Sequence, residues 1–203
     1  LSIRRQRQMC IRDSGTAAYP QGVEATFDNE VVDDVISAVR LVKSLPEIDS
    51  ARVYVLGHSL GGMLVPRIAQ RAGEGCLGGI ISLAGPVRKM EQLLTEQMTY
   101  ISSLSGTQPD VKAAVEQVMN SLPESYRKME TEYQPVEVAR MLKLPFLVLQ
   151  GERDYQVTMQ DFGMWRFGLY RNPNVLFKSY PKLNHALQEG SGKSTPFEYT
   201  HLS

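Results

Sequence analysis

The 203-residue sequence predicts an α/β fold built on a mainly parallel sheet. Two observations support this prediction. Short runs of β-branched and apolar residues alternate along the chain with amphipathic segments of helical period, which is the order expected of successive β–α–β units. The composition, 42% hydrophobic and 22% charged, is that of an ordinary globular protein. It excludes a disordered, collagenous or low-complexity chain.

The first expected helix spans residues 28–44, where Asp28 is a suitable N-cap. Its apolar residues recur at spacings of three and four, at Val31, Val32, Val35, Val39 and Val42. A buried strand (RVYVL) is expected over 52–56, and a helix over 60–71, which Gly73 and Gly75 end. The later strands are expected at residues 79–83 (GIISL), 145–150 (PFLVLQ) and 175–180 (VLFKSY). The last of these alternates more clearly between apolar and polar residues, so we expect it nearer an edge of the sheet.

A long insertion, residues 87–143, separates the second and third expected strands. It exceeds fifty residues and is therefore too long for a simple crossover connection. Its apolar residues have helical spacing, with Met90, Leu93, Leu94 and Met98 in one group and Val111, Val115, Val118 and Met119 in another. We expect a helical cap over the C-terminal edge of the sheet. The alternative, that these side chains only pack the helices together, stays open.

The first fourteen residues, LSIRRQRQMCIRDS, show neither turn chemistry nor a clear apolar period. Their last six, MCIRDS, are typical of a DNA-library adapter translated in frame, so we expect residues 1–14 to be a sequencing artefact. Residues 15–203 would then be part of a bacterial α/β domain recovered from environmental DNA. A basic N-terminal arm or a degraded signal peptide is the alternative, but the apolar core of a signal peptide is missing.

Charge and motif content narrow the class of function. The chain has 22 basic and 22 acidic residues, so it carries no net charge to attract nucleic acid. No apolar stretch is long enough to cross a bilayer. Cys10 and Cys76 cannot form a disulfide framework, and no metal-binding or cofactor motif is present. The segment Gly190-Ser191-Gly192-Lys193-Ser194-Thr195 lacks the upstream glycine of a phosphate-binding loop, so we expect a surface loop there.

The most informative segment is Gly57-His58-Ser59-Leu60-Gly61-Gly62, a G-x-S-x-G motif between a predicted strand and a predicted helix. A serine in such a sharp turn is strained and presents its hydroxyl above the sheet. Gly57 and Gly61 are expected because side chains there would collide with the neighbouring strand and helix. The helix N-terminus favours negative charge, and the backbone N–H of Leu60 is the expected first oxyanion donor.

Three segments together resemble the α/β-hydrolase superfamily: VLGHSLGG (55–62), LQGERDYQV (149–157) and YPKLNHAL (180–187). The resemblance extends from Gly15 to the C-terminus. It is strongest to bacterial esterases, dienelactone-hydrolase-like proteins and serine-aminopeptidase-like proteins. It implies an α/β-hydrolase fold and a catalytic triad in the chain order Ser, Asp or Glu, His.

That order points to Ser59 as nucleophile, Asp154 as acid and His185 as base, because both later residues follow predicted strands. Two other histidines compete with His185: His58, whose ring should point away from the attack face, and His201, near the end of the chain. Glu152 and Asp161 compete with Asp154, and each is otherwise expected to be a solvated surface carboxylate.

The function that these residues imply is hydrolysis of a carboxylic ester through an acyl-enzyme, with no cofactor or metal. A serine peptidase or acyl-aminopeptidase of the same fold is the alternative substrate class. A non-catalytic homologue is the alternative outside enzymes. The expected partner is a small ester or a short peptide.

In the α/β-hydrolases that this chain resembles, the second oxyanion donor normally comes from a loop that would precede Gly15. Only four strands can be counted, and the chain ends soon after the expected histidine loop. We therefore expect a partial α/β-hydrolase domain that exposes one side of its sheet. We also expect its own activity to be weak or absent.

Overall fold

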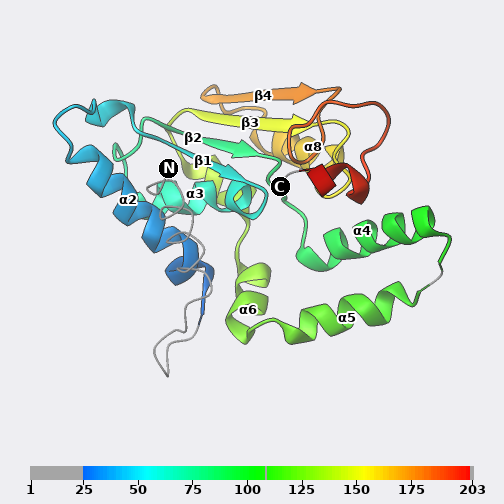
Figure 1. Ribbon diagram of the computed structural model, residues 1–203. Helices are drawn as coiled ribbons and strands as arrows, with labels where there is room; N and C mark the ends of the chain where they lie inside the picture. Colours follow the sequence, from blue (N-terminus) through cyan, green and yellow to red (C-terminus); the bar gives the residue numbers. More distant parts are fainter. Residues whose placement is uncertain (1–24, 108, 202–203) are drawn as a thin grey trace.

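The computed structural model describes residues 25–107 and 109–201, so the expected adapter-derived segment lies outside the described residues. Within them, one sheet of four parallel strands runs in the order β1-β2-β3-β4 (Figure 1). The strands are β1 (Tyr54–His58), β2 (Gly79–Leu83), β3 (Phe146–Gly151) and β4 (Val175–Tyr180). All four C-terminal ends therefore meet at one edge, where open α/β sheets bind ligands.

The predicted strands agree closely with the structure. β2 and β4 have the predicted bounds, and β4 lies at an edge of the described sheet, as its alternating pattern indicates. β1 begins two residues later than predicted. A short 3-10 turn, η2 (Ser50–Arg52), occupies that place because the Asp49 side chain accepts a hydrogen bond from the Ala51 N–H and holds the turn.

The helices also follow the predicted order. The first begins as a π-helical turn, η1 (Asp28–Val32), and continues as α2 (Asp33–Lys43). The helix that follows Ser59 is α3 (Leu60–Ala72). The remaining helices are α4 (Met90–Ser105), α5 (Val111–Ser121), α6 (Glu124–Glu132), α7 (Pro135–Met141), α8 (Met159–Leu169) and the 3-10 helix η3 (Pro196–His201).

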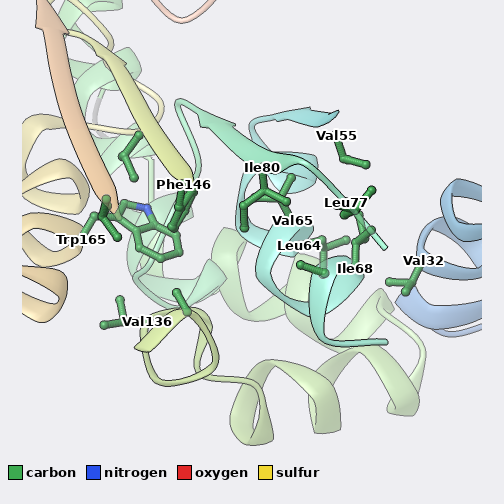
Figure 2. Packing of buried hydrophobic residues seen from close by; sticks show 14 of the residues in the cluster. Val32, Val55, Leu64, Val65, Ile68, Leu77, Ile80, Val136, Phe146 and Trp165 are labelled. Carbon is green, nitrogen blue, oxygen red and sulfur yellow. The ribbon is translucent and has the colours of Figure 1, made fainter. Parts of the chain in front are cut away.

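The core lies between the sheet and a helical layer on one of its faces. α3 packs against β1 and β2, α8 packs against β3, and α7 contacts both α3 and α8. The side chains between them are almost fully buried and include Leu64, Val65, Ile80, Phe146 and Trp165 (Figure 2). Burial of such aliphatic and aromatic side chains is the main force that stabilises the fold.

The opposite face of the sheet is more open among the described residues. Tyr54, Leu56 and Leu176 are 55%, 56% and 68% exposed, although neighbouring Val55 and Val175 are buried. This alternation follows from the two-residue period of a strand, which turns successive side chains to opposite faces. One face of the described sheet therefore carries exposed apolar side chains.

Residues 87–143 are largely helical. α4 and α5 pack on each other, and α4, α5 and α6 extend away from the sheet as a separate arm (Figure 1). α7 instead joins the layer that covers the sheet, through its contacts with α3 and α8. Of the helices in the described part of the chain, none combines the length and apolar character needed to span a membrane.

Candidate active site

Ser59 lies in a strained turn between β1 and α3. Its backbone angles, φ 56° and ψ −120°, place it in a region that residues with a side chain rarely adopt. The Ser59 N–H donates to the Leu83 carbonyl at 2.9 Å, and the Ser59 carbonyl accepts from the Met63 N–H. These bonds hold the turn to β2 on one side and start α3 on the other. This is the strand–turn–helix geometry that the G-x-S-x-G motif predicts.

Glycines permit this turn, but not the pair that was predicted. A Cβ added at Gly57 would lie 2.1 Å from the Gly61 carbonyl oxygen, so a side chain there is excluded. A Cβ at Gly62 would lie 2.8 Å from the Gly85 Cα, because α3 passes close to the chain that leaves β2. The expectation for Gly61 was wrong, since a Cβ there would meet nothing within 4 Å.

The side chains of Asp154 and His185 are directly bonded. His185 Nδ1 lies 2.6 Å from Asp154 Oδ2, and both side chains are buried. Asp154 follows β3 and His185 follows β4, so two neighbouring strand ends bring them together. The bond at Nδ1 leaves the Nε2 atom of His185 as the ring nitrogen available to a hydroxyl group.

The Asp154 carboxylate is held by further donors. Its Oδ1 accepts the N–H groups of Gln156 and Val157 at 2.8 and 3.1 Å, and Gln150 Nε2 lies 3.2 Å from Oδ2. Several donors to one buried carboxylate fix its orientation. The turn after β3 therefore presents a rigid acceptor to His185.

His58 connects the turn that carries Ser59 to the loop that carries His185. Its Nε2 lies 2.7 Å from the His185 carbonyl oxygen, and the two imidazole rings are 4.6 Å apart. Since the carbonyl can only accept, His58 Nε2 carries the proton in this bond. The residue next to Ser59 is thereby in contact with His185. The predicted orientation of His58, away from the attack face, did not anticipate this contact.

Ser59 and Leu60 line a cavity of about 380 Å³ between the sheet edge and the helical arm. Its wall is rich in methionine, with Met63 from α3, Met90 from α4, Met129 from α6 and Met164 from α8. Tyr133 also lines it and donates from its hydroxyl to the Met63 carbonyl at 2.7 Å. Burial raises the pKa of the Tyr133 hydroxyl, so this group stays neutral.

A family model described as the prolyl oligopeptidase family matches residues 17–200. The chain belongs to the prolyl oligopeptidase family. Esterase EstD of Thermotoga maritima is 35% identical to it over 191 residues, which are 86% of this chain and 44% of EstD. YtmA of Bacillus subtilis, an uncharacterised peptidase, is 26% identical over 137 residues, 66% of this chain and 47% of YtmA. The chain thus spans less than half the length of these two curated relatives.

Solved structures confirm the α/β-hydrolase fold. Est1E from Butyrivibrio proteoclasticus has a TM-score of 0.55 at 16% identity, and the match covers 81% of this chain and 64% of the Est1E chain. The acylaminoacyl peptidase of Pyrococcus horikoshii has a TM-score of 0.51 at 17% identity, covering 77% and 23%. Together with the family match, these structures confirm the resemblance to the α/β-hydrolase superfamily.

Within this prolyl oligopeptidase-family chain, the competing carboxylates occupy other places. Glu152 is exposed and accepts a hydrogen bond from the Ser179 hydroxyl at 2.7 Å. Asp161 lies on α8, as predicted, but it is fully buried, so its expected place as a surface carboxylate was wrong. Neither carboxylate has a bond to His185 comparable to that of Asp154. His201 lies in η3, and its side chain is outside the described set.

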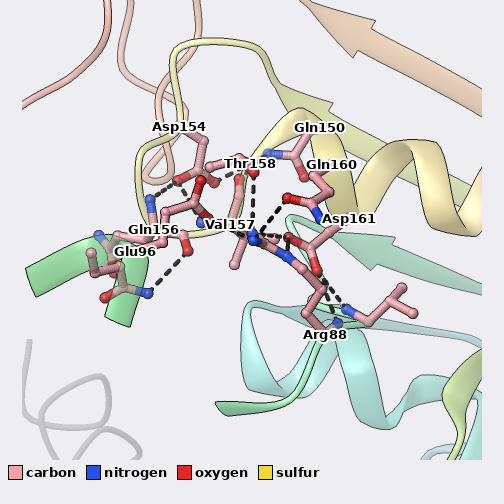
Figure 3. Close-up of polar contacts among 12 residues, drawn as sticks. Arg88, Glu96, Gln150, Asp154, Gln156, Val157, Thr158, Gln160 and Asp161 are labelled. Atoms are coloured by element: carbon pink, nitrogen blue, oxygen red, sulfur yellow. Dashed lines mark hydrogen bonds and ion pairs between the residues drawn. The ribbon is translucent and has the colours of Figure 1, made fainter. Parts of the chain in front are cut away.

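Asp161 is buried because it pairs with Arg88, the second residue of the insertion. Asp161 Oδ1 accepts the N–H groups of Val87 and Arg88, and Oδ2 lies 2.8 Å from an Arg88 guanidinium nitrogen (Figure 3). Arg88 also donates to Glu96 on α4 and to Thr158, which follows the turn that carries Asp154. This network ties the start of the insertion to the segment after Asp154. The one signal of this network in the sequence is an arginine after an apolar strand, which does not identify Asp161 as its partner.

Proposed function

We propose that this chain carries the reactive centre of a serine ester hydrolase, with Ser59 as nucleophile, Asp154 as orienting acid and His185 as general base. The observation that supports this most directly is the Asp154–His185 bond. It fixes Nδ1 as the protonated nitrogen and leaves Nε2 free to accept a proton. The contact of His58, the neighbour of Ser59, with His185 supports a base that lies close to the turn carrying the serine.

In the proposed reaction, His185 Nε2 takes the proton of the Ser59 hydroxyl as the oxygen attacks the ester carbonyl. A Ser59 O–C bond forms, and the carbonyl oxygen becomes an oxyanion that accepts the Leu60 N–H at the start of α3. The C–O bond to the alcohol then breaks, and His185 returns its proton to the leaving alkoxide. Water, deprotonated in turn by His185, attacks the acyl-enzyme and releases the acid and free Ser59.

The insertion, residues 87–143, is proposed as the cap that selects the substrate. Residues from α4 and α6 line the cavity beside Ser59, among them Met90, Leu93 and Met129. Flexible thioether side chains adapt to different apolar groups. A cavity of about 380 Å³ fits a small ester or a short peptide.

A peptidase is the second candidate, because YtmA is named a peptidase and the family description is that of an oligopeptidase. The EstD match favours the ester, since it is more similar and covers more of the chain. A pair of substrates with the same acyl group, one an ester and one an amide, separates the two. Because esters are intrinsically more reactive than amides, turnover of the ester with no turnover of the amide supports the proposal, and turnover of the amide contradicts it.

The test of the reactive centre is covalent labelling by a fluorophosphonate, which reacts with an activated serine. Because the turnover of this chain is expected to be weak or absent, the readout is one covalent event per molecule: we expect slow labelling at Ser59 and none in the Ser59→Ala variant. Ser82→Ala is the matched control, because Ser82 is fully buried on β2 and should leave labelling unchanged. A folded chain that is not labelled, or is labelled equally in Ser59→Ala, would falsify the proposed function in favour of a non-catalytic homologue.

A further inference from the structure

Arg153, the residue before Asp154, is held by residues 190–198, the segment that follows the loop carrying His185. Its side chain is only 6% exposed. The guanidinium donates to the Gly192 carbonyl at 2.8 Å, and one of its terminal nitrogens lies 2.8 Å from each carboxylate oxygen of Glu198 in η3. A Cβ at Gly190 would lie 2.3 Å from that guanidinium, so the loop closes tightly around it. Such a buried cation needs its partners, because an unpaired one is costly.

The backbone of Arg153 is held by the same segment. Its carbonyl accepts both the N–H and the hydroxyl of Ser194, at 2.9 and 2.7 Å, and Ser194 is fully buried. The expectation of a plain surface loop therefore fails at Ser194. The Arg153 N–H in turn donates to the Leu183 carbonyl in the histidine loop.

Asn184, the residue before His185, shapes the loop that carries the base. It is fully buried, and its side-chain oxygen accepts the N–H groups of Ala186 and Gln188 at 3.0 and 2.9 Å. These bonds fold the chain around His185 into a tight turn. The remaining polar atom of the side chain, Nδ2, lies 3.2 Å from Glu198 Oε2.

One carboxylate thus contacts the residues immediately before the acid and before the base. Glu198 receives Arg153 on both oxygens and Asn184 on one, and its Oε1 also accepts the Thr195 N–H. We infer that Glu198 is a positioning residue that sets the separation and orientation of Asp154 and His185 by holding the residues that precede them. This inference rests on the proposed function of Asp154 and His185.

The charge of Glu198 fits this position. Partial burial acts to raise the pKa of its carboxyl, but the hydrogen bonds from Arg153, Thr195 and Asn184 lower the pKa by more. The lowered pKa keeps the Glu198 carboxylate ionised, so it supplies the counter-charge that the buried Arg153 guanidinium needs. Small displacements of reacting groups have large kinetic effects, so a loosened link of this kind should slow the reaction without removing any reacting atom.

The experiment compares Glu198→Gln with Glu189→Gln, the same change at an exposed carboxylate of the same segment. Two readouts are used. The first is the rate of fluorophosphonate labelling at Ser59, and the second is the downfield proton resonance of His185 Nδ1–H, assigned by its loss in His185→Asn. We expect Glu198→Gln to slow labelling by about 100-fold and to shift or broaden the resonance. Glu189→Gln should match the unmodified chain in both.

A folded Glu198→Gln with unchanged labelling and an unchanged resonance overturns the inference. If Glu198→Gln does not fold, Glu198→Asp replaces it, since the charge is kept but the shorter side chain cannot reach both partners. Slower labelling by Glu198→Asp then supports the inference, and a rate equal to that of the unmodified chain overturns it. If the unmodified chain is not labelled, the proposed function fails. The resonance alone then decides whether Glu198 positions His185.

Discussion

The Nδ1 atom of His185 lies 2.6 Å from the Oδ2 atom of Asp154, although the two residues are 31 positions apart in the chain. The two side chains meet because parallel β3 and β4 are neighbours in the sheet and end at the same edge, so the turns that follow them lie next to each other. A buried carboxylate on Nδ1 fixes the imidazole tautomer that a serine hydrolase requires.

Asp154→Asn should leave the fold intact and abolish most reactivity. An amide can donate to Nδ1 and so stabilise the wrong tautomer of His185, which in a comparable triad reduces turnover about 10⁴-fold. The measurement is the fluorophosphonate labelling rate, with thermal unfolding as the check on folding. Glu152→Gln is the matched control, since Glu152 contacts Ser179 and not His185. Comparable rates in both variants would exclude Asp154 as the orienting acid.

Gly57→Ala and Gly61→Ala should have opposite effects on stability. The first places a Cβ 2.1 Å from the Gly61 carbonyl oxygen and forces the serine turn open. Such a clash with backbone costs several kcal/mol, beyond the usual ~1–3 kcal/mol of overpacking. The second adds a methyl group to open space within α3 and should stabilise the chain by about 0.5–1 kcal/mol. Urea unfolding measures both, and destabilisation by Gly61→Ala would contradict the described turn.

Asp161→Asn should destabilise the chain strongly. It removes the charge that balances Arg88, whose side chain is 7% exposed, and the loss of one partner of a buried pair costs about 3–5 kcal/mol. Glu137→Gln is the control, because the Glu137–Arg140 pair is about half exposed and is worth about 0–1 kcal/mol. The free energy of unfolding in urea is the measurement. Equal losses in the two variants would show that the Arg88 network does not stabilise the link between insertion and sheet.

Asp28 should make the stability of the chain fall in acid. A hydrogen bond from Arg67 lowers the pKa of the Asp28 carboxyl, against the opposing effect of burial, and the charges of Arg67 and Arg71 lower it further. A folded-state pKa below the unfolded value of about 3.9 means that the contribution is complete above that pH and is lost as the pH falls through the lower folded value.

The measurement is unfolding of the unmodified chain and of Asp28→Asn between neutral pH and pH 2. We expect the variant to be less stable at pH 7 by about 1 kcal/mol, since the pair is only partly buried, and the difference to shrink towards acid. A difference that stays constant across this range would contradict the prediction.

Local pattern was enough to predict the elements around the site. The strands β2 and β4 have the predicted bounds, and helix α3 starts at the predicted residue. These features depend on periodicity, turn residues and motif spacing within a few residues, all of which are visible in the chain itself. The choice of Asp154 and His185 depended on a resemblance to a family, and their roles stay predictions until the labelling experiments are done.

Contacts between distant residues could not be predicted in this way. Asp161 looked like a surface carboxylate, because its partner Arg88 precedes it by 73 residues. Gly62, rather than Gly61, faces a close neighbour only because α3 passes Gly85. His58 meets a carbonyl 127 residues later in the chain.

The sequence by itself determined the α/β class, the order of strands and helices, and the serine turn, because each follows from the period and the backbone preferences of neighbouring residues. Only the tertiary structure decided which polar side chains are buried and what they bond to. That depends on which segments the parallel sheet brings to its common edge, and neither hydrophobic period nor residue spacing specifies those partners.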